Sequence, residues 1–291
     1  VQAAYPVAVG PVLQRVERML GMVAEEKGVK VNIQEFNGQN DATTLNQIGT
    51  QFVSDGYDAV IPIATLAAQC MTTACESTKT PVIYAAISDP AAADLTDIDY
   101  VTGTSDALNT QSIMDMMFAV QPDIQTVGLL YSNSEANSAT PIAEAKAYLD
   151  AKGISYVEKT GNTSGEIVEA AASMVGRVDA VFTPTDNVVM AAEVTVAETL
   201  NEAGIPHYTG ADSFVRNGAY ATCGVNYTDL GTQTADLAYT DMTEGMDGME
   251  DYYLMDGGII TVNTETAAIL GIDYSVFSSM ANTVVEVKTG E

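Results

Sequence analysis

The sequence predicts an α/β fold with two Rossmann-like lobes, each built around a parallel sheet. Strand-like and helix-like segments alternate along almost the whole chain, which favours parallel strands joined by right-handed crossovers. A short pattern also occurs twice, over residues 57–90 and 178–212. In each copy an apolar strand ends in a small polar residue, a helix follows, and a second strand ends in an acid. Two copies of one unit predict two similar lobes that face each other across a cleft.

Hydrophobic periodicity, proline and glycine give the expected elements in order. Pro11 suits the first turn of a helix that stops at Gly28. Pro122 marks a break, and Gly153 stops a later helix. The expected strands cover residues 29–36, 57–65, 81–90, 100–106, 126–131, 154–158, 178–185, 206–212, 219–226, 259–262 and 283–287. The expected helices cover residues 11–27, 109–120, 166–176 and 230–245, and others end near residues 55, 152 and 270.

Composition limits the possible partners. The 291 residues are enough for two domains of ordinary size, and 47% hydrophobic against 17% charged residues is typical of globular proteins. The 39 acidic residues against 11 basic ones give a formal net charge of −28, and no basic cluster offsets it. This charge opposes binding to nucleic acid and to anionic membranes, so neither is an expected partner.

No apolar run reaches the roughly 18 residues that a membrane-spanning helix needs. The chain starts at Val1 without a visible signal peptide, which leaves open whether a leader or a lipid-anchored cysteine was removed. Cys70 and Cys75 are five residues apart on an expected helix and cannot bridge, and Cys223 stands alone in an apolar strand. We therefore expect buried free thiols. The methionines of the 109–120 helix are likewise expected in the core.

Polar residues gather where the expected strands end. In an open parallel sheet these positions meet at one edge, beside the free N–H groups of the following helices, and ligands bind there. The set contains hydroxyls, amides and acids but no lysine or arginine. Its members are Thr65, Ser88, Asp89, Ser105, Asp106, Ser134, Glu135, Asn137, Ser138, Thr185, Asp186, Asn187, Asp212 and Asn226. Helix capping, which prefers the same residue types, is the alternative for each of them.

Catalytic patterns are weak, so an enzyme is not expected. The single histidine, His207, lies inside an expected strand and is interpreted as structural. Gly103 and Gly210 are isolated glycines, so no phosphate-binding loop is present. No serine lies in a nucleophile-elbow pattern. A lone histidine without clustered cysteines gives no metal site, and no cofactor is expected.

A series of motifs resembles one known family along nearly the whole chain. They are Ile63-Ala64-Thr65-Leu66-Ala67-Ala68-Gln69, Ser88-Asp89-Pro90, Val101-Thr102-Gly103-Thr104-Ser105-Asp106, Tyr131-Ser132-Asn133-Ser134-Glu135-Ala136-Asn137-Ser138, Pro184-Thr185-Asp186-Asn187, Tyr227-Thr228-Asp229-Leu230-Gly231 and Ile260-Thr261-Val262-Asn263-Thr264-Glu265-Thr266-Ala267. Together they resemble the periplasmic substrate-binding components of ABC transporters for tryptophan and tyrosine.

The resemblance implies a type I periplasmic-binding fold with three hinge crossings. It places residues 1–106 and 228–248 in an N-terminal lobe, and residues 107–227 and 249–291 in a C-terminal lobe. The start departs from the family, whose first strand should be complete before Gln2, so a truncated or displaced first strand is expected. Tyr5-Pro6 stands where the family often has His-Pro.

The function implied is that of a monomeric extracytoplasmic solute-binding protein, in the periplasm or lipid-anchored on the outer face of the cytoplasmic membrane. Its partners would be ABC permease subunits and a small amino acid-like ligand, expected to be aromatic: Trp, Tyr or Phe. Hinge closure would be stabilised by the ligand. A sensory binding module of the same fold that reports to a receptor is the alternative, and a hydrolase or isomerase on this scaffold ranks third.

The expected ligand contacts divide by charge. Arg15, Arg18, Arg177 and Arg216 all fall outside the expected strand ends. The ligand carboxylate should therefore meet hydroxyls and helix N-terminal N–H groups, and its ammonium should meet an acid, with Asp212 favoured. The carboxylate set is Thr65, Ser134, Asn137 and Ser138, the acids are Asp89, Asp186 and Asp212, and Ser105 and Asn187 complete the expected site. The alternative is that all three acids cap helices or turns.

Overall fold

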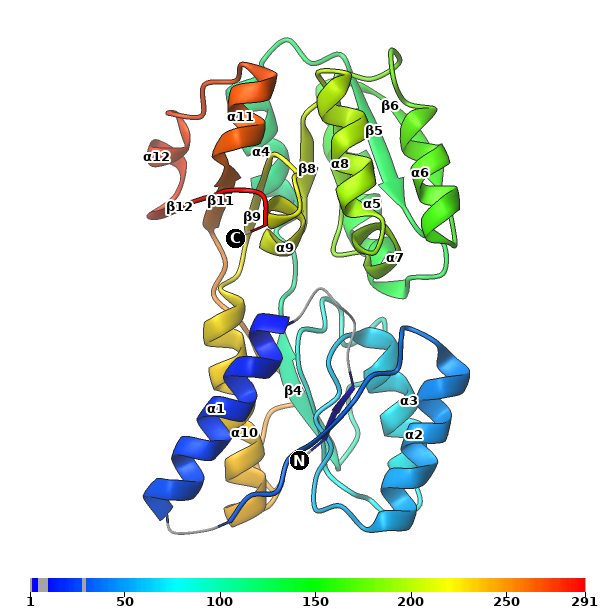
Figure 1. Cartoon of the computed structure of the whole chain (residues 1–291), viewed down its shortest axis with the longest axis vertical. Helices are drawn as coiled ribbons and strands as arrows, with labels where there is room; N and C mark the ends of the chain where they lie inside the picture. Colours follow the sequence, from blue (N-terminus) through cyan, green and yellow to red (C-terminus); the bar gives the residue numbers. More distant parts are fainter. Residues whose placement is uncertain (1, 5–9, 28–29, 291) are drawn as a thin grey trace. The chain divides into compact units, whose positions relative to one another are not determined.

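The computed structural model describes residues 2–4, 10–27 and 30–290 (Figure 1). The chain forms two compact units. Unit 1 comprises Val1–Ala107 and Asn226–Met255, and unit 2 comprises Leu108–Val225 and Asp256–Glu291, so the chain passes between the units three times. Residues 107, 226–227 and 249–255, expected in the second lobe, belong to unit 1. Residues 249–255 lie there because a two-residue strand, β10 (Tyr253–Leu254), pairs in parallel with β4 (Val101–Ser105).

Unit 1 is a layered α/β unit whose described strand pairs are all parallel. Its sheets have the orders β1-β2 and β10-β4-β3. Of the strand expected over residues 57–65, only a bridged segment at residues 60–63 forms, and it exchanges backbone hydrogen bonds with the β3 segment on one side. The elements not yet given are β1 (Gln2–Ala4), α1 (Gly10–Lys27), β2 (Gln34–Phe36), α2 (Ala42–Asp55), α3 (Thr65–Cys75), β3 (Val82–Tyr84) and α10 (Tyr227–Glu244).

Two helix pairs flank the strands of unit 1 (Figure 1). Helix α1 packs along α10, and α2 packs along α3. Helix α2 begins where the Asp41 carboxylate accepts a hydrogen bond from the Thr44 N–H at 2.7 Å, and it ends at Gly56, which adopts the left-handed conformation. Phe52 lies at the centre of this side of the core and makes edge-on contacts with Phe36 and Tyr57.

The start of the chain forms a short first strand. This strand, β1, has three residues, begins at Gln2 and pairs in parallel with β2, which agrees with a displaced first strand. Register places Gln2 opposite Gln34 and Ala4 opposite Phe36. Tyr5 lies outside the described residues.

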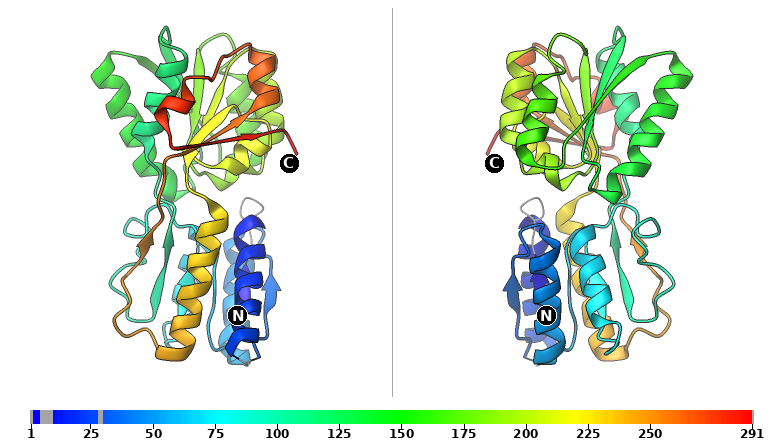
Figure 2. Two further views of the ribbon diagram at one scale, coloured as in Figure 1. Left: turned by 90° about the vertical axis from the view of Figure 1, so that its left-hand side faces the viewer. Right: turned by 90° about the vertical axis from the view of Figure 1, so that its right-hand side faces the viewer.

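Unit 2 is built on one seven-stranded sheet of order β12-β11-β9-β8-β7-β5-β6. Every neighbouring pair is parallel except β9 and β11, which are antiparallel. Helices cover both faces of this sheet (Figure 2). The strands are β5 (Thr126–Tyr131), β6 (Ser155–Thr160), β7 (Ala180–Thr183), β8 (His207–Thr209), β9 (Ala221–Gly224), β11 (Ile259–Asn263) and β12 (Thr283–Val287). The helices are α4 (Thr110–Val120), α5 (Ala139–Lys152), α6 (Ser164–Ala172), α7 (Asn187–Met190), α8 (Glu193–Glu202), α9 (Asp212–Arg216), α11 (Thr264–Leu270) and α12 (Phe277–Met280).

The buried side chains of the two units confirm two expectations. Met114, Met116 and Met117 of α4 are fully buried against the sheet, as expected for gap-filling side chains. All three cysteines are buried free thiols, with Cys223 on β9 and the other two on α3 of unit 1. The α/β class with predominantly parallel sheets is likewise confirmed, and the one antiparallel pair is the exception.

Unit 1 should lose stability as the pH rises through neutrality. A hydrogen bond with Glu35, together with burial, raises the pKa of Glu17 from 4.5 to about 7. Between these values the folded state holds a proton that the unfolded state has released, so this contribution is complete below pH 4.5 and is lost through pH 7. Thermal unfolding of Glu17→Gln at a series of pH values should show a flatter profile than the parent protein. Glu202→Gln, on the exposed end of α8, is the control and should keep the parent profile. An unchanged profile in Glu17→Gln would show that Glu17 and Glu35 do not share a proton.

Candidate functional site

The carboxyl edge of the unit 2 sheet brings several predicted residues together. Strands β5 and β7 are adjacent and parallel, so the turns that follow Tyr131 and Thr183 lie side by side. The first turn continues into a short 3-10 segment (Ala136–Ser138) and α5, and the second continues into α7. Together they carry Ser134, Asn137, Ser138, Asp186 and Asn187.

Asp186 joins these two turns through four hydrogen bonds. One carboxylate oxygen accepts from the backbone N–H of Ser132 and from the hydroxyl of Ser138, both at 2.7 Å. The other accepts from the N–H groups of Val188 and Val189, both at 3.0 Å, and so caps α7. The side chain has no exposed surface. Asp186 thus supports the capping alternative and holds Ser138 in place.

The remaining polar groups of this edge lie around the Asp186 link. The Asn137 amide donates to the carbonyl of Thr185, and the Asn187 amide donates to Glu135 at 2.9 Å. Ser134 is exposed, and its hydroxyl is 2.7 Å from that of Ser132. We call Ser134, Asn137, Ser138, Asp186 and Asn187 the strand-end cluster of unit 2. It offers hydroxyl and amide groups without a lysine or arginine.

The next strand end, after β8, differs from the prediction. A Cβ atom at position 210 would lie 2.6 Å from the backbone nitrogen of Thr185. Only glycine therefore permits the turn after β8 to approach the turn after β7 this closely. Asp212, the favoured ammonium partner, instead accepts a hydrogen bond from the Arg216 side chain at 3.0 Å. Arg216 was expected away from the strand ends, and one turn of α9 brings it to this edge.

A buried chain of polar groups lies among the strands β7, β8 and helix α8. The His207 ring nitrogens are 3.0 Å from the Glu193 carboxylate and 2.8 Å from the Thr183 hydroxyl. All three side chains are buried, so the prediction of a structural histidine is confirmed. Burial raises the pKa of Glu193, and His207 opposes that shift. These contacts hold Thr183, the last residue of β7, just before the turn that carries Asp186.

The carboxyl edge of unit 1 contains two residues with unusual backbone angles. Ala64, which precedes Thr65 at the start of α3, has φ 71° and ψ 159°, a region that is essentially glycine-only. Its N–H donates to the Ala85 carbonyl at 3.0 Å. Ala86, at φ 57°, lies in the left-handed region two residues before Ser88. Strain of this kind, costing about 1–3 kcal/mol per residue, is concentrated at ligand-binding and active sites.

A second buried acid, Asp106, binds two side chains at this edge. Asp106 accepts a hydrogen bond from the Ser88 hydroxyl at 2.9 Å and one from the Tyr227 hydroxyl at 2.6 Å. Burial raises the pKa of Asp106, and the hydrogen bonds from Tyr227 and Ser88 oppose that shift. Tyr227, the first residue of α10, was not among the predicted site residues, because a helix-starting tyrosine gives no sequence signal for a partner 121 positions away.

Ser105 and Asp89 complete the predicted residues of unit 1. Ser105 ends β4, is fully buried and accepts a hydrogen bond from the Ala107 N–H at 3.2 Å. Asp89 accepts one from the Ala92 N–H at 3.0 Å, as expected for an acid that caps a turn before Pro90. Asp89 is half-buried, and it lies next to Ser88.

Two further findings concern membranes and metals. No helix within residues 2–4, 10–27 and 30–290 combines the length and the apolar character needed to cross a bilayer. Within the same residues, no group of three or more His, Cys, Asp or Glu side chains could hold a metal ion.

Comparison with known proteins now identifies the class of protein. Residues 17–282 match the family described as ABC transporter substrate binding protein, and the chain belongs to this family. A curated relative from Clostridioides difficile, named tyrosine-binding protein, is 31% identical over 270 residues, which cover 89% of this chain and 77% of the relative. Substrate-binding proteins of this kind are extracytoplasmic, and the family is not a class of enzymes.

Two solved structures extend the likeness to the fold. An ABC domain from Streptococcus pneumonia in complex with L-Trp is 28% identical, with a TM-score of 0.87 over 98% of this chain and all of the other. A ligand-free, open structure of a substrate-binding protein with adhesive properties from Clostridium difficile is 29% identical. Its TM-score is 0.71 over 99% of this chain and 98% of the other.

Replacing Asp186 should cost stability in unit 2. In Asp186→Asn an NH₂ group would replace one carboxylate oxygen and would face N–H or O–H donors. Those buried donors would lose their acceptor, so the free energy of unfolding should fall by about 2–4 kcal/mol. Urea unfolding measures the loss, and hydrogen exchange should show faster exchange at Ser132, Val188 and Val189. Asp150→Asn, on the exposed end of α5, is the matched control. A variant with parent stability and impaired ligand binding would instead identify Asp186 as a ligand contact.

Proposed function

We propose that the protein binds an aromatic amino acid, Trp, Tyr or Phe, outside the cytoplasmic membrane and delivers it to the permease of an ABC transporter. Family membership supports the transporter role. A relative named for tyrosine and a structural relative that holds L-Trp, both similar over most of the chain, support the ligand class. We further propose that the protein acts as a monomer, is not an enzyme, and is either free in the periplasm or lipid-anchored on the outer face of the cytoplasmic membrane.

One observation carries the proposal: the carboxyl edges of both units present neutral hydroxyl, amide and backbone groups, and buried acids hold the segments that carry them. In unit 2 Asp186 fixes Ser138 and the turn that holds Ser132 and Ser134. In unit 1 Asp106 fixes Ser88. Neutral groups with fixed geometry can bind the carboxylate of an amino acid, and no charged side chain of the protein has to lose its water for this contact.

The carboxylate of the amino acid is assigned to neutral groups at a carboxyl edge, with the strand-end cluster of unit 2 as one candidate and the start of α3 in unit 1 as the other. Ser134 is exposed, and Asn137 lies in the segment that leads into α5. Thr65 is the first residue of α3, an 11-residue helix whose first N–H groups favour negative charge. Arg216 is paired with Asp212, which leaves this task to neutral donors.

The ammonium group is assigned to Asp89. Asp186 and Asp212 are not retained, because the first accepts four hydrogen bonds within unit 2 and the second is paired with Arg216. Asp89 is half-buried beside Ser88, and a carboxylate accepts about four hydrogen bonds, so it can hold the Ala92 N–H and contact an ammonium group as well. A buried ammonium needs such a charged partner.

A screen of the twenty amino acids by thermal shift tests the ligand class. A ligand that binds only the folded state stabilises it by about 2.7 kcal/mol at a hundredfold excess over Kd. We expect Trp, Tyr or Phe to raise the melting temperature most, and calorimetry should give a single site. The same side chains without an amino or a carboxyl group should bind more weakly. Stabilisation by none of the three would refute an aromatic amino acid ligand.

Asp89→Asn tests the ammonium contact. The variant should remain folded, because an amide oxygen can still accept the Ala92 N–H, and it should weaken binding of the amino acid by about 2–5 kcal/mol. Indole-3-propionate, which lacks the ammonium group, should bind parent and variant alike if tryptophan is the ligand. Asp99→Asn, on the exposed loop before β4, is the control. Equal losses for both ligands would show that Asp89 acts through the turn and does not contact the ammonium.

A further inference from the structure

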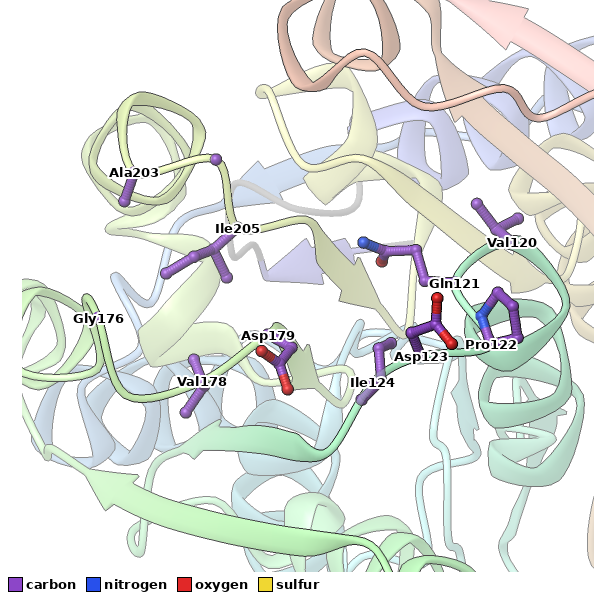
Figure 3. Close-up of a pocket in the computed structure, with 11 residues that line it drawn as sticks. Val120, Gln121, Pro122, Asp123, Ile124, Gly176, Val178, Asp179, Ala203 and Ile205 are labelled. Carbon is purple, nitrogen blue, oxygen red and sulfur yellow. The ribbon is translucent and has the colours of Figure 1, made fainter.

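A pocket lies at the amino edge of the unit 2 sheet, opposite the strand-end cluster (Figure 3). It has a volume of about 520 Å³ and is formed by the three turns that precede β5, β7 and β8. The strand-end cluster follows the other ends of β5 and β7. Since β5 has six residues, the two sites are separated by roughly 20 Å of sheet.

The helices that precede these turns make the pocket electronegative. In a parallel α/β unit the helices run antiparallel to the strands, so α4, α6 and α8 all end at this edge. A helix end presents unsatisfied carbonyl groups and the negative end of the macrodipole. Three such ends around one pocket favour a positively charged occupant.

Two carboxylates add formal charge. Asp179 is held in place because one of its oxygens accepts the backbone N–H groups of Gln125 and Thr126, at 2.8 and 2.9 Å. The Asp123 side chain has no hydrogen bond or ion pair within the described part of the chain. No residue that lines the pocket is basic, and Arg177, although next in sequence to two lining residues, is not among those that line it.

The remaining lining is apolar apart from one oriented amide. Ile124, Val178 and Ile205 contribute aliphatic surface, and the Gln121 oxygen accepts a hydrogen bond from Tyr208 at 3.2 Å. This bond fixes the Gln121 carbonyl, and Figure 3 shows the amide among the lining side chains. The two carboxylates are exposed, and no group of three or more His, Cys, Asp or Glu side chains that could hold a metal ion occurs in the described part of the chain.

We propose that this pocket binds a small organic cation, a diamine or a guanidinium compound with a short aliphatic body. Asp123 and Asp179 contact its charged groups, and Val178 and Ile205 contact the aliphatic part. The ammonium or guanidinium groups replace water with charge-assisted hydrogen bonds to the two carboxylates. The site is separate from that of the amino acid, so both ligands bind at once.

Calorimetry at low ionic strength with cadaverine and agmatine tests this site. We expect saturable one-to-one binding with Kd of about 1 mM or below, and none with the neutral 1,5-pentanediol. Asp123→Asn should weaken binding by about tenfold or more, and Asp150→Asn, an exposed acid on α5, should leave it unchanged. Ala203→Arg places a guanidinium on the rim and should abolish binding.

Several outcomes would overturn the proposal. They are no saturable binding of either cation up to about 10 mM, parent affinity in both Asp123→Asn and Ala203→Arg, and equal losses in Asp123→Asn and Asp150→Asn. The last would indicate attraction to the acidic surface as a whole. Displacement of the cation by the aromatic amino acid would show a shared site. Asp179→Asn is avoided because this side chain also holds the start of β5.

Discussion

The burial of the Asp186 carboxylate is the constraint on which the carboxyl edge of unit 2 depends. An ionised group removed from water is stable only when donors surround it, and here four donors come from two different turns. Because the acceptor is shared, neither turn can shift without leaving a buried donor or acceptor unpaired. Adjacent parallel strands bring the two turns together, and the acid then fixes their relative positions.

Unit 1 also contains a buried acid that joins distant segments, but the residues differ. Asp106 is buried and holds Ser88 and Tyr227, which are distant in sequence. In both units, therefore, a buried acid is used for structure, and hydroxyls, amides and backbone N–H groups lie beside it at the edge. The backbone strain at Ala64 is found in the same place, where packing must hold the segment against its intrinsic preference.

The sequence predicts the class of fold and most elements because hydrophobic periodicity and helix stop signals are local. It also predicts the buried methionines and thiols, whose side chains have few alternatives to the core. It does not assign roles to the acids. The partners of Asp186 on the preceding turn lie 48 and 54 positions away, and no local pattern reveals them. The pairing of Asp212 with Arg216 has a four-residue spacing and could have been found from the sequence.

The burial of all three thiols has a practical consequence for a protein that works outside the cytoplasm. Oxidation and disulfide exchange require an accessible thiolate, and burial raises the pKa of Cys70, Cys75 and Cys223 while it excludes oxidants. The native chain is therefore protected from covalent dimerisation in an oxidising compartment. A cysteine introduced on the surface would be the one thiol that a maleimide dye reaches readily, so fluorescent labels can be attached at chosen positions without first removing the native cysteines.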